Sequence, residues 1–202
     1  DALAQVQREE KQIHIKVWET EDRLRLDFAD NGSEEQFNDF RKTLDTCIKP
    51  ETKWMLTMAS HEYFSDDGEE GALKRLKEIM KQEPDNHIVI NGFHFISVTT
   101  TRGCKFSDEK REWIKKELAA AAADDPFKPI FFFQHPHVTD TVYGSIYWGE
   151  DELYEILSNY PQLITFSGHS HCPINDPRSV HQKYFTSFGT GSFNYFELDE
   201  FD

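Results

Sequence analysis

Two short segments of this sequence carry histidines at positions i and i+2: His135 and His137 in a His-Pro-His stretch, and His169 and His171 in a Gly-His-Ser-His stretch. In an extended chain such side chains point to the same side, so each segment can present two imidazoles together. Imidazole nitrogen binds borderline divalent transition metals. Taken alone, each pair fits a solvated loop as well as it fits a pair of metal ligands.

Two further polar clusters stand earlier in the chain, at Asp27–Gly32 (Asp-Phe-Ala-Asp-Asn-Gly) and at Ala59–Glu62 (Ala-Ser-His-Glu). All four clusters follow directly on an apolar run of the kind that predicts a β-strand. These runs are Leu24–Leu26, Trp54–Met58, Ile130–Phe133 and Leu163–Ser167. The carboxyl ends of parallel strands share one edge of an α/β sheet, where ligand sites form. The four clusters are therefore expected to meet in space.

Histidine nitrogen together with carboxylate oxygen suits Zn, Mn, Fe, Co or Ni and does not suit calcium. One aspartate with several histidines can hold two such ions about 3.5–4 Å apart, and pairs of this kind activate water and clamp phosphoester oxygens. We therefore expect a metal site that hydrolyses a phosphoester. Rival chemistries lack their motifs, because the chain contains no H-E-x-x-H, no G-x-S-x-G and no G-x-x-x-x-G-K-[ST] segment.

The elements that would position these clusters alternate between helix and strand, which predicts a layered α/β domain. A Ser-x-x-Gln capping box at Ser33 predicts a helix through about Cys47. Three more helices are predicted at 69–82, 107–123 and 150–159. The expected strands are 24–28, 54–58, 87–90, 93–98, 130–134 and 163–167, with closing strands in 185–198. We see no internal repeat or linker, and expect a single domain over residues 1–202.

Composition narrows the class of protein further. The chain has 202 residues, is 38% hydrophobic and carries a net charge of -15. That charge disfavours a nucleic-acid or membrane partner, and the apolar runs are too short to cross a bilayer, so a soluble globular protein is expected. The three cysteines show no C-x-x-C spacing, and we interpret them as ordinary thiols. The cellular compartment is left open.

With these residues in place, the sequence resembles the calcineurin-like metallophosphoesterases, in particular the cyclic-nucleotide and glycerophosphodiester phosphodiesterase-like members. Gly-His-Ser-His at 168–171 matches the family's G-H-x-H motif. Residues 27–32 resemble the end of its G-D-x-x-D-[NG]-G motif, and 59–62 stand in the place of G-N-H-[DE]. The order and spacing agree over residues 24–198.

The resemblance implies a fold and a set of roles. The fold would be two packed mixed β-sheets flanked by helices, in four layers. Asp27 would bridge two metals, His171 would bind the first, and His135 and His169 would bind the second, with His137 as the alternative to His135. His61 would act as the general acid, or as the group that steadies the phosphate oxygen and the leaving group. The substrate would be a small phosphoester, most naturally a phosphodiester.

The sequence also departs from the family pattern. No D-x-H segment, which would supply the first metal with ligands, stands upstream of Asp27, and the chain begins at Asp1. Leu26 replaces a glycine, and Ser60 replaces an asparagine that would bind the second metal. We therefore expect one metal ion and feeble hydrolysis by this chain. The alternatives are a catalytically impaired binding or regulatory module of the same fold, and a metal-storing or structural α/β domain.

Overall fold

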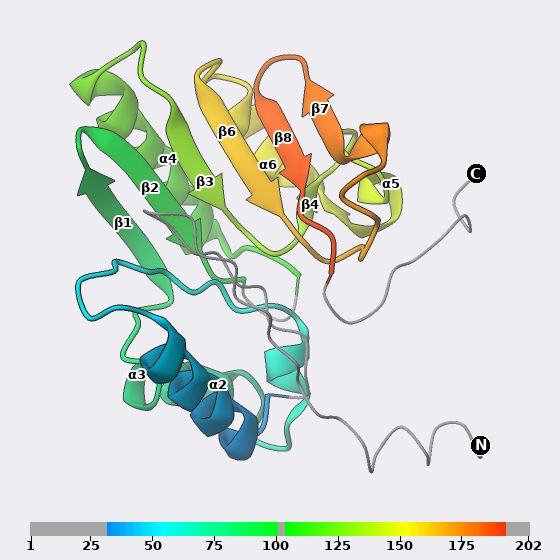
Figure 1. Ribbon diagram of the computed structural model, residues 1–202. Helices are drawn as coiled ribbons and strands as arrows, with labels where there is room; N and C mark the ends of the chain where they lie inside the picture. The colour runs from blue at the N-terminus through cyan, green and yellow to red at the C-terminus, as the bar shows by residue number, and fades with distance from the viewer. Residues whose placement is uncertain (1–31, 101–103, 193–202) are drawn as a thin grey trace.

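The computed structural model describes residues 32–100 and 104–192 (Figure 1). The predicted strand at 24–28, and Asp27 with it, lies outside these residues. The described chain begins with helix α2 (Glu34–Cys47). Ser33 accepts a hydrogen bond from the Gln36 backbone N–H, and the Gln36 side chain accepts one from the Ser33 N–H at 3.0 Å. The predicted capping box is confirmed.

Six strands form one mixed sheet in the order β1-β2-β3-β6-β8-β7. Strands β2, β3, β6 and β8 run parallel, whereas the edge strands β1 and β7 are antiparallel to their neighbours. The carboxyl ends of the four parallel strands therefore lie at one edge of the sheet (Figure 1). The strands are β1 (Asp85–Ile90), β2 (Phe93–Val98), β3 (Ile130–Phe133), β6 (Leu163–Ser167), β7 (Val180–Gln182) and β8 (Thr186–Gly189).

The α/β class predicted from the sequence is confirmed, and a second small sheet pairs β4 (His137–Val138) in parallel with β5 (Gly149–Glu150). The other predicted helices are α3 (Gly68–Glu78), α4 (Asp108–Asp124) and α6 (Asp151–Leu157). Across the described ranges, no helix combines the length and the apolar character that a membrane crossing requires.

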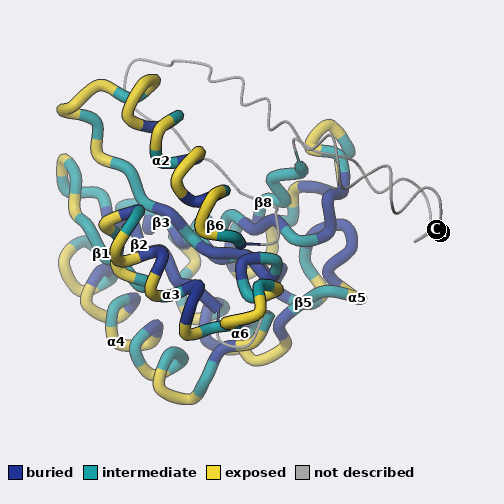
Figure 2. The backbone as a smooth tube through the Cα atoms, turned by 90° about the horizontal axis from the view of Figure 1, so that it is seen from below, coloured by how far each residue is buried: buried dark blue, intermediate teal, exposed yellow. Residues whose placement is uncertain are grey.

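Helices α4 and α6 pack on one face of the six-stranded sheet, behind it in Figure 1. Because side chains alternate along a strand, this face carries every second residue, among them Ile96, Phe132 and Leu163. Ile114 of α4 and Leu157 of α6 are fully buried against them. The outward turns of α4 are exposed (Figure 2). Burial of each such side chain stabilises the fold by about 1.5–3 kcal/mol.

The opposite face of the sheet is aromatic. Phe95 stacks on Phe131 with ring centroids 4.9 Å apart, and Phe166 stacks between Phe133 at 5.2 Å and Phe188 at 5.4 Å. These rings come from four adjacent parallel strands, so they form a continuous layer. Aromatic pairs of this offset kind add about 0.5–1.5 kcal/mol beyond the area that they bury.

A chain of hydrogen bonds links helix α4 to strands β1 and β2, on the side of the sheet where β1 is the outermost strand. His87 of β1 lies 2.7 Å from Glu117 of α4 and 2.7 Å from His94 of β2. The other nitrogen of His94 lies 3.2 Å from Asp124 at the end of α4. The helix is therefore held to β1 and β2 by polar contacts at two points as well as by its apolar face.

Helices α2 and α3 form a second apolar cluster, which lies beyond the sheet edge where the parallel strands end (Figure 1). Phe40 and Leu44 of α2 pack with Leu76 of α3 and with Met58 of the preceding loop. Helix α3 also contacts the 3-10 turn η1 (His61–Phe64). This cluster thus supports the segment that carries His61.

The strand predicted at Trp54–Met58 is wrong. The segment is not in a strand within the described chain, and the backbone N–H of Met58 reaches the Thr99 hydroxyl at 3.4 Å instead of a neighbouring carbonyl. Its apolar residues are buried by α2 and α3, so the apolar run reflects burial and not sheet pairing. The short elements α5 (Ser145–Trp148) and η2 (Pro177–Ser179) were not predicted, because three or four residues carry no periodic signal.

Candidate metal centre

Strand pairing brings two of the predicted clusters together. Strands β3 and β6 are parallel neighbours, with Phe133 opposite Phe166, so the residues that follow them leave the sheet side by side. The N–H of Gly168 donates to the carbonyl of His135 at 3.0 Å. His135 and His169 therefore stand next to each other at the carboxyl edge of the sheet.

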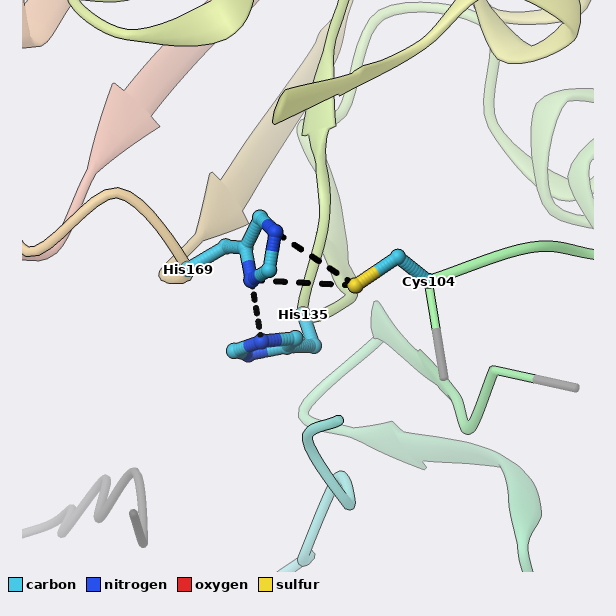
Figure 3. A group of neighbouring side chains, drawn as sticks. All are labelled: Cys104, His135 and His169. Carbon is cyan, nitrogen blue, oxygen red and sulfur yellow. Dashed lines mark hydrogen bonds between the residues drawn. The ribbon is translucent and has the colours of Figure 1, made fainter. Parts of the chain in front are cut away.

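Three side chains converge there: Cys104, His135 and His169 (Figure 3). Their candidate ligand atoms all lie within 4.8 Å of one another. His135 Nε2 is 2.9 Å from His169 Nδ1, and Cys104 Sγ is 3.4 Å from His169 Nε2 and 3.7 Å from Nδ1. This group, hereafter the Cys-His-His cluster, could hold a metal ion.

The donor set and its spacing both fit a transition metal. Ligand atoms about 2.0–2.3 Å from a tetrahedral ion stand about 3.3–3.8 Å apart, close to the spacing in the Cys-His-His cluster. Sulfur with two imidazole nitrogens suits zinc and its neighbours and does not suit the hard cations magnesium and calcium. Three protein ligands leave room for water or substrate, which is the pattern of catalytic zinc sites.

The backbone at the cluster is strained. His169 has φ 70° and His171 has φ 56°, in the left-handed region that side chains with a Cβ rarely adopt. The Ser170 N–H donates to the Gly168 carbonyl at 2.9 Å, which makes His169 the apex of a strained γ-turn with positive φ. Strain of this kind costs about 1–3 kcal/mol per residue and concentrates at functional sites.

His137 has a different role from His135. Its Nδ1 lies 2.7 Å from the Ser167 hydroxyl and its Nε2 lies 2.7 Å from the Ser170 hydroxyl. The ring is 1% exposed. Both nitrogens are thus engaged by protein, so among the described residues it is His135 that faces His169. His137 instead holds the turn that carries His169, through Ser170.

Electrostatics keep these imidazoles neutral. Burial, followed by the charge of His169, lowers the pKa of His135 well below its usual value. Burial, followed by the charges of His171 and His61, lowers the pKa of His169 to about 4. Burial also lowers the pKa of His137 to about 3. A neutral imidazole has a lone pair for a metal, so the two cluster histidines are ready to bind at neutral pH.

Cys104 is half-buried, and burial raises the pKa of its thiol, while a hydrogen bond with Ser60 and the charge of Lys105 oppose this. Without a metal the sulfur is therefore held as a thiol, and a metal ion would deprotonate it on binding. Sequence reasoning passed over this residue. The signal available in the sequence was its position shortly after a predicted strand, 93–98; that this strand lies next to β3 is a property of the fold.

His61 stands at the start of η1, and its charge lowers the pKa of both His135 and His169. The turn that carries His61 is fixed from two sides. The buried Glu62 carboxylate accepts a hydrogen bond from the Ala59 N–H at 2.8 Å. A Cβ on Gly32 would come within 2.3 Å of the Glu62 carbonyl oxygen, so only glycine allows this approach.

The five predicted site residues are therefore placed as follows. His135 and His169 lie in the Cys-His-His cluster, and His61 lies beside it. His171 is 9% exposed and acts on the pKa of His169, but it is not a member of the cluster. Asp27 lies outside the described residues.

The ring of Trp148 in α5 borders the cluster and meets the His169 ring edge to face, with centroids 5.9 Å apart.

The sequence matches no protein-family model and no curated protein.

Proposed function

We propose that this chain hydrolyses a small phosphoester with the help of a divalent transition metal, on a calcineurin-like metallophosphoesterase scaffold. The observation that carries the proposal is the convergence of Cys104, His135 and His169 at the carboxyl edge of the sheet, with His61 beside them. A bound divalent ion supplies a Lewis acid that acidifies water and neutralises charge on phosphoryl oxygens. Phosphoester hydrolysis makes use of both effects.

The residues of the chain have distinct tasks in this proposal. His135 and His169 hold the metal through neutral imidazoles, and His137 with Ser170 keeps the His169 turn in place. His61 provides the proton that the leaving group requires. It suits this task because it lies near the cluster without being one of its three donors. General acids of this kind accelerate turnover by about 10²–10⁴.

Asp27 and His171 keep in this proposal the roles that the resemblance implies, Asp27 as a bridging ligand and His171 as a ligand of the first metal position. Asp27 lies outside the described residues, whereas the charge of His171 lowers the pKa of His169. In this chain we expect one ion, at the Cys-His-His cluster, because that cluster alone has three donors among the described residues.

The finer fold proposal is the four-layer arrangement of two packed sheets flanked by helices. Its support is the aromatic face of the six-stranded sheet, where stacked rings cover adjacent strands on the side away from α4 and α6. In the proposed arrangement, a second sheet would pack on this aromatic face at a distance of about 10 Å and bury it.

The test combines metal analysis with hydrolysis. Purified protein is incubated with Zn²⁺ or Mn²⁺, desalted, and assayed for metal content and for cleavage of bis(p-nitrophenyl) phosphate. We expect slow, metal-dependent hydrolysis. His169→Ala should lower metal affinity at least about ten-fold, whereas His61→Ala should lower turnover about 10²–10⁴-fold with the metal retained. His181→Gln, on the edge strand β7, is the matched control and should change neither.

Two results would count against the proposal. Protein that binds no metal, or hydrolysis that persists unchanged in His169→Ala, would remove the metal centre from the mechanism. Metal binding through His169 without cleavage of any phosphomonoester or diester would favour the binding or regulatory module.

A further inference from the structure

Cys104 lies where the expected ligand set of the second metal position is incomplete. The resemblance implies an asparagine ligand at the position of Ser60, whose hydroxyl is shorter and a weaker neutral donor than an amide oxygen. Ser60 is buried, at 8% exposure, and forms a hydrogen bond with the Cys104 side chain. The Cys104 sulfur therefore lies beside Ser60, where the resemblance implies an asparagine ligand that this chain does not have.

The position of the sulfur relative to the histidines is that of a third ligand. Cys104 Sγ is within 3.7 Å of both nitrogens of His169 and within 4.8 Å of the candidate nitrogen of His135. Figure 3 shows the three side chains pointing toward one another, His135 and His169 from the segments that follow β3 and β6, and Cys104 from a loop. The other cysteines offer no such contact in the described structure, since Cys47 is exposed at the end of α2 and neither it nor Cys172 belongs to the cluster.

We propose that Cys104 binds the metal as a thiolate, in place of the amide that Ser60 cannot supply, and that it makes the centre selective for Zn²⁺ and Co²⁺ over Mn²⁺ and Mg²⁺. This inference rests on the metal centre of the proposed function. On binding, the S–H bond breaks, the sulfur lone pair forms the bond to the metal, and the proton passes to solvent. No oxidant or reductant takes part.

The selectivity follows from ligand softness. Carboxylate, carbonyl and water oxygens suit Mg²⁺ and Mn²⁺, whereas thiolate sulfur favours zinc and softer ions. A site with one sulfur and two imidazoles thus departs from the oxygen-rich sites that Mn²⁺ prefers. With Cys104 as ligand, the Cys-His-His cluster reaches three protein ligands without any residue outside the described ranges.

Cobalt spectroscopy tests the proposal directly, because a thiolate bound to Co²⁺ gives a near-ultraviolet charge-transfer band that imidazole ligands do not give. The full chain is titrated with Co²⁺ while its ultraviolet and visible spectra are recorded. We expect the charge-transfer band in the wild type and in the control Cys47→Ser. It should be absent from Cys104→Ser, which should still show the weaker visible bands of bound Co²⁺.

The outcomes separate this inference from the proposed function. A wild type that binds Co²⁺ without the charge-transfer band, or a band that survives in Cys104→Ser, overturns the thiolate ligand and leaves the metal centre standing. A wild type that binds no Co²⁺ overturns both. Far-ultraviolet circular dichroism establishes that the variants are folded.

Competition between Zn²⁺ and Mn²⁺ gives a second readout. Cys104→Ser should lower the ratio of Zn²⁺ to Mn²⁺ affinity at least about ten-fold. Loss of a residue that only supports a metal ligand already lowers metal affinity by about 10–100-fold, so loss of a ligand should have at least this effect. Cys104→Asp supplies a carboxylate oxygen and should move the preference further toward Mn²⁺. An affinity ratio that is the same in wild type, Cys104→Ser and Cys104→Asp overturns the claim of selectivity.

Discussion

Replacing Ser170 by alanine should destabilise the protein by about 2–3 kcal/mol. The Ser170 hydroxyl is 2% exposed, lies 2.7 Å from His137 Nε2 and accepts a hydrogen bond from the Cys172 N–H at 3.3 Å. The hydroxyl also lies 3.4 Å from the Tyr143 carbonyl. Alanine removes these buried hydrogen bonds, and the loss of a partner from a buried polar group costs about 1–3 kcal/mol. The loss is large against a total stability of about 5–15 kcal/mol.

The matched control is the same substitution at Ser187 of β8. That hydroxyl is also fully buried, at 0% exposure, but it has no hydrogen-bond partner in the described structure. Ser187→Ala removes a buried polar group that is not compensated, so it should be neutral or should stabilise by up to about 1 kcal/mol. The two variants make the same chemical change, but only Ser170→Ala is expected to lower the free energy of unfolding.

Urea unfolding followed by tryptophan fluorescence measures both free energies, and thermal unfolding should show a fall of about 4–12 °C for Ser170→Ala, at about 2–4 °C per kcal/mol. Equal effects of the two substitutions, or a change within about 0.5 kcal/mol for Ser170→Ala, would refute the role of the Ser170 hydroxyl in holding His137 and the turn that carries His169.

Three further predictions concern the same region. The pKa values of His137, about 3, and His169, about 4, lie below the ordinary value of 6.5, so below pH 6.5 the unfolded chain takes up protons that the folded chain does not. The contribution of these histidines to the stability of the metal-free protein is fully present above pH 6.5. The free energy of unfolding should therefore fall by about 1.4 kcal/mol per pH unit for each histidine as the pH drops toward 4. Urea unfolding at pH 7 and pH 5 that gives equal free energies would contradict this. His169→Gly should be about 1–2 kcal/mol more stable than His169→Ala, because only glycine adopts φ 70° without strain; thermal melts of the two variants, both defective in metal binding, decide it. Gly32→Ala should destabilise the fold and slow hydrolysis, since its Cβ would lie 2.3 Å from the Glu62 carbonyl oxygen; unchanged turnover and melting temperature would show that the His61 turn is not fixed by this contact.

Local signals in the sequence were sufficient for most helices and central strands. The capping box at Ser33 and the serine cap before α4 determine where those helices begin, because caps act over three or four residues. The apolar runs that became β2 and β6 were predicted with their observed bounds. The histidine pairs were recognisable for the same reason, since spacing at i and i+2 is visible in one segment.

What the sequence could not determine depends on contacts between distant segments. The order β2-β3-β6 brings Cys104 to His135 and His169, and strand order is set by the packing of the whole sheet and not by any one strand. Burial by α2 and α3, rather than pairing, explains the apolar run that ends at Met58. The different surroundings of His135 and His137 likewise depend on distant residues, because Ser167 of β6 and Ser170 just after it engage both nitrogens of His137. Residue types and local spacing thus determined which chemistry could be expected, whereas non-local strand pairing decided which side chains lie close together.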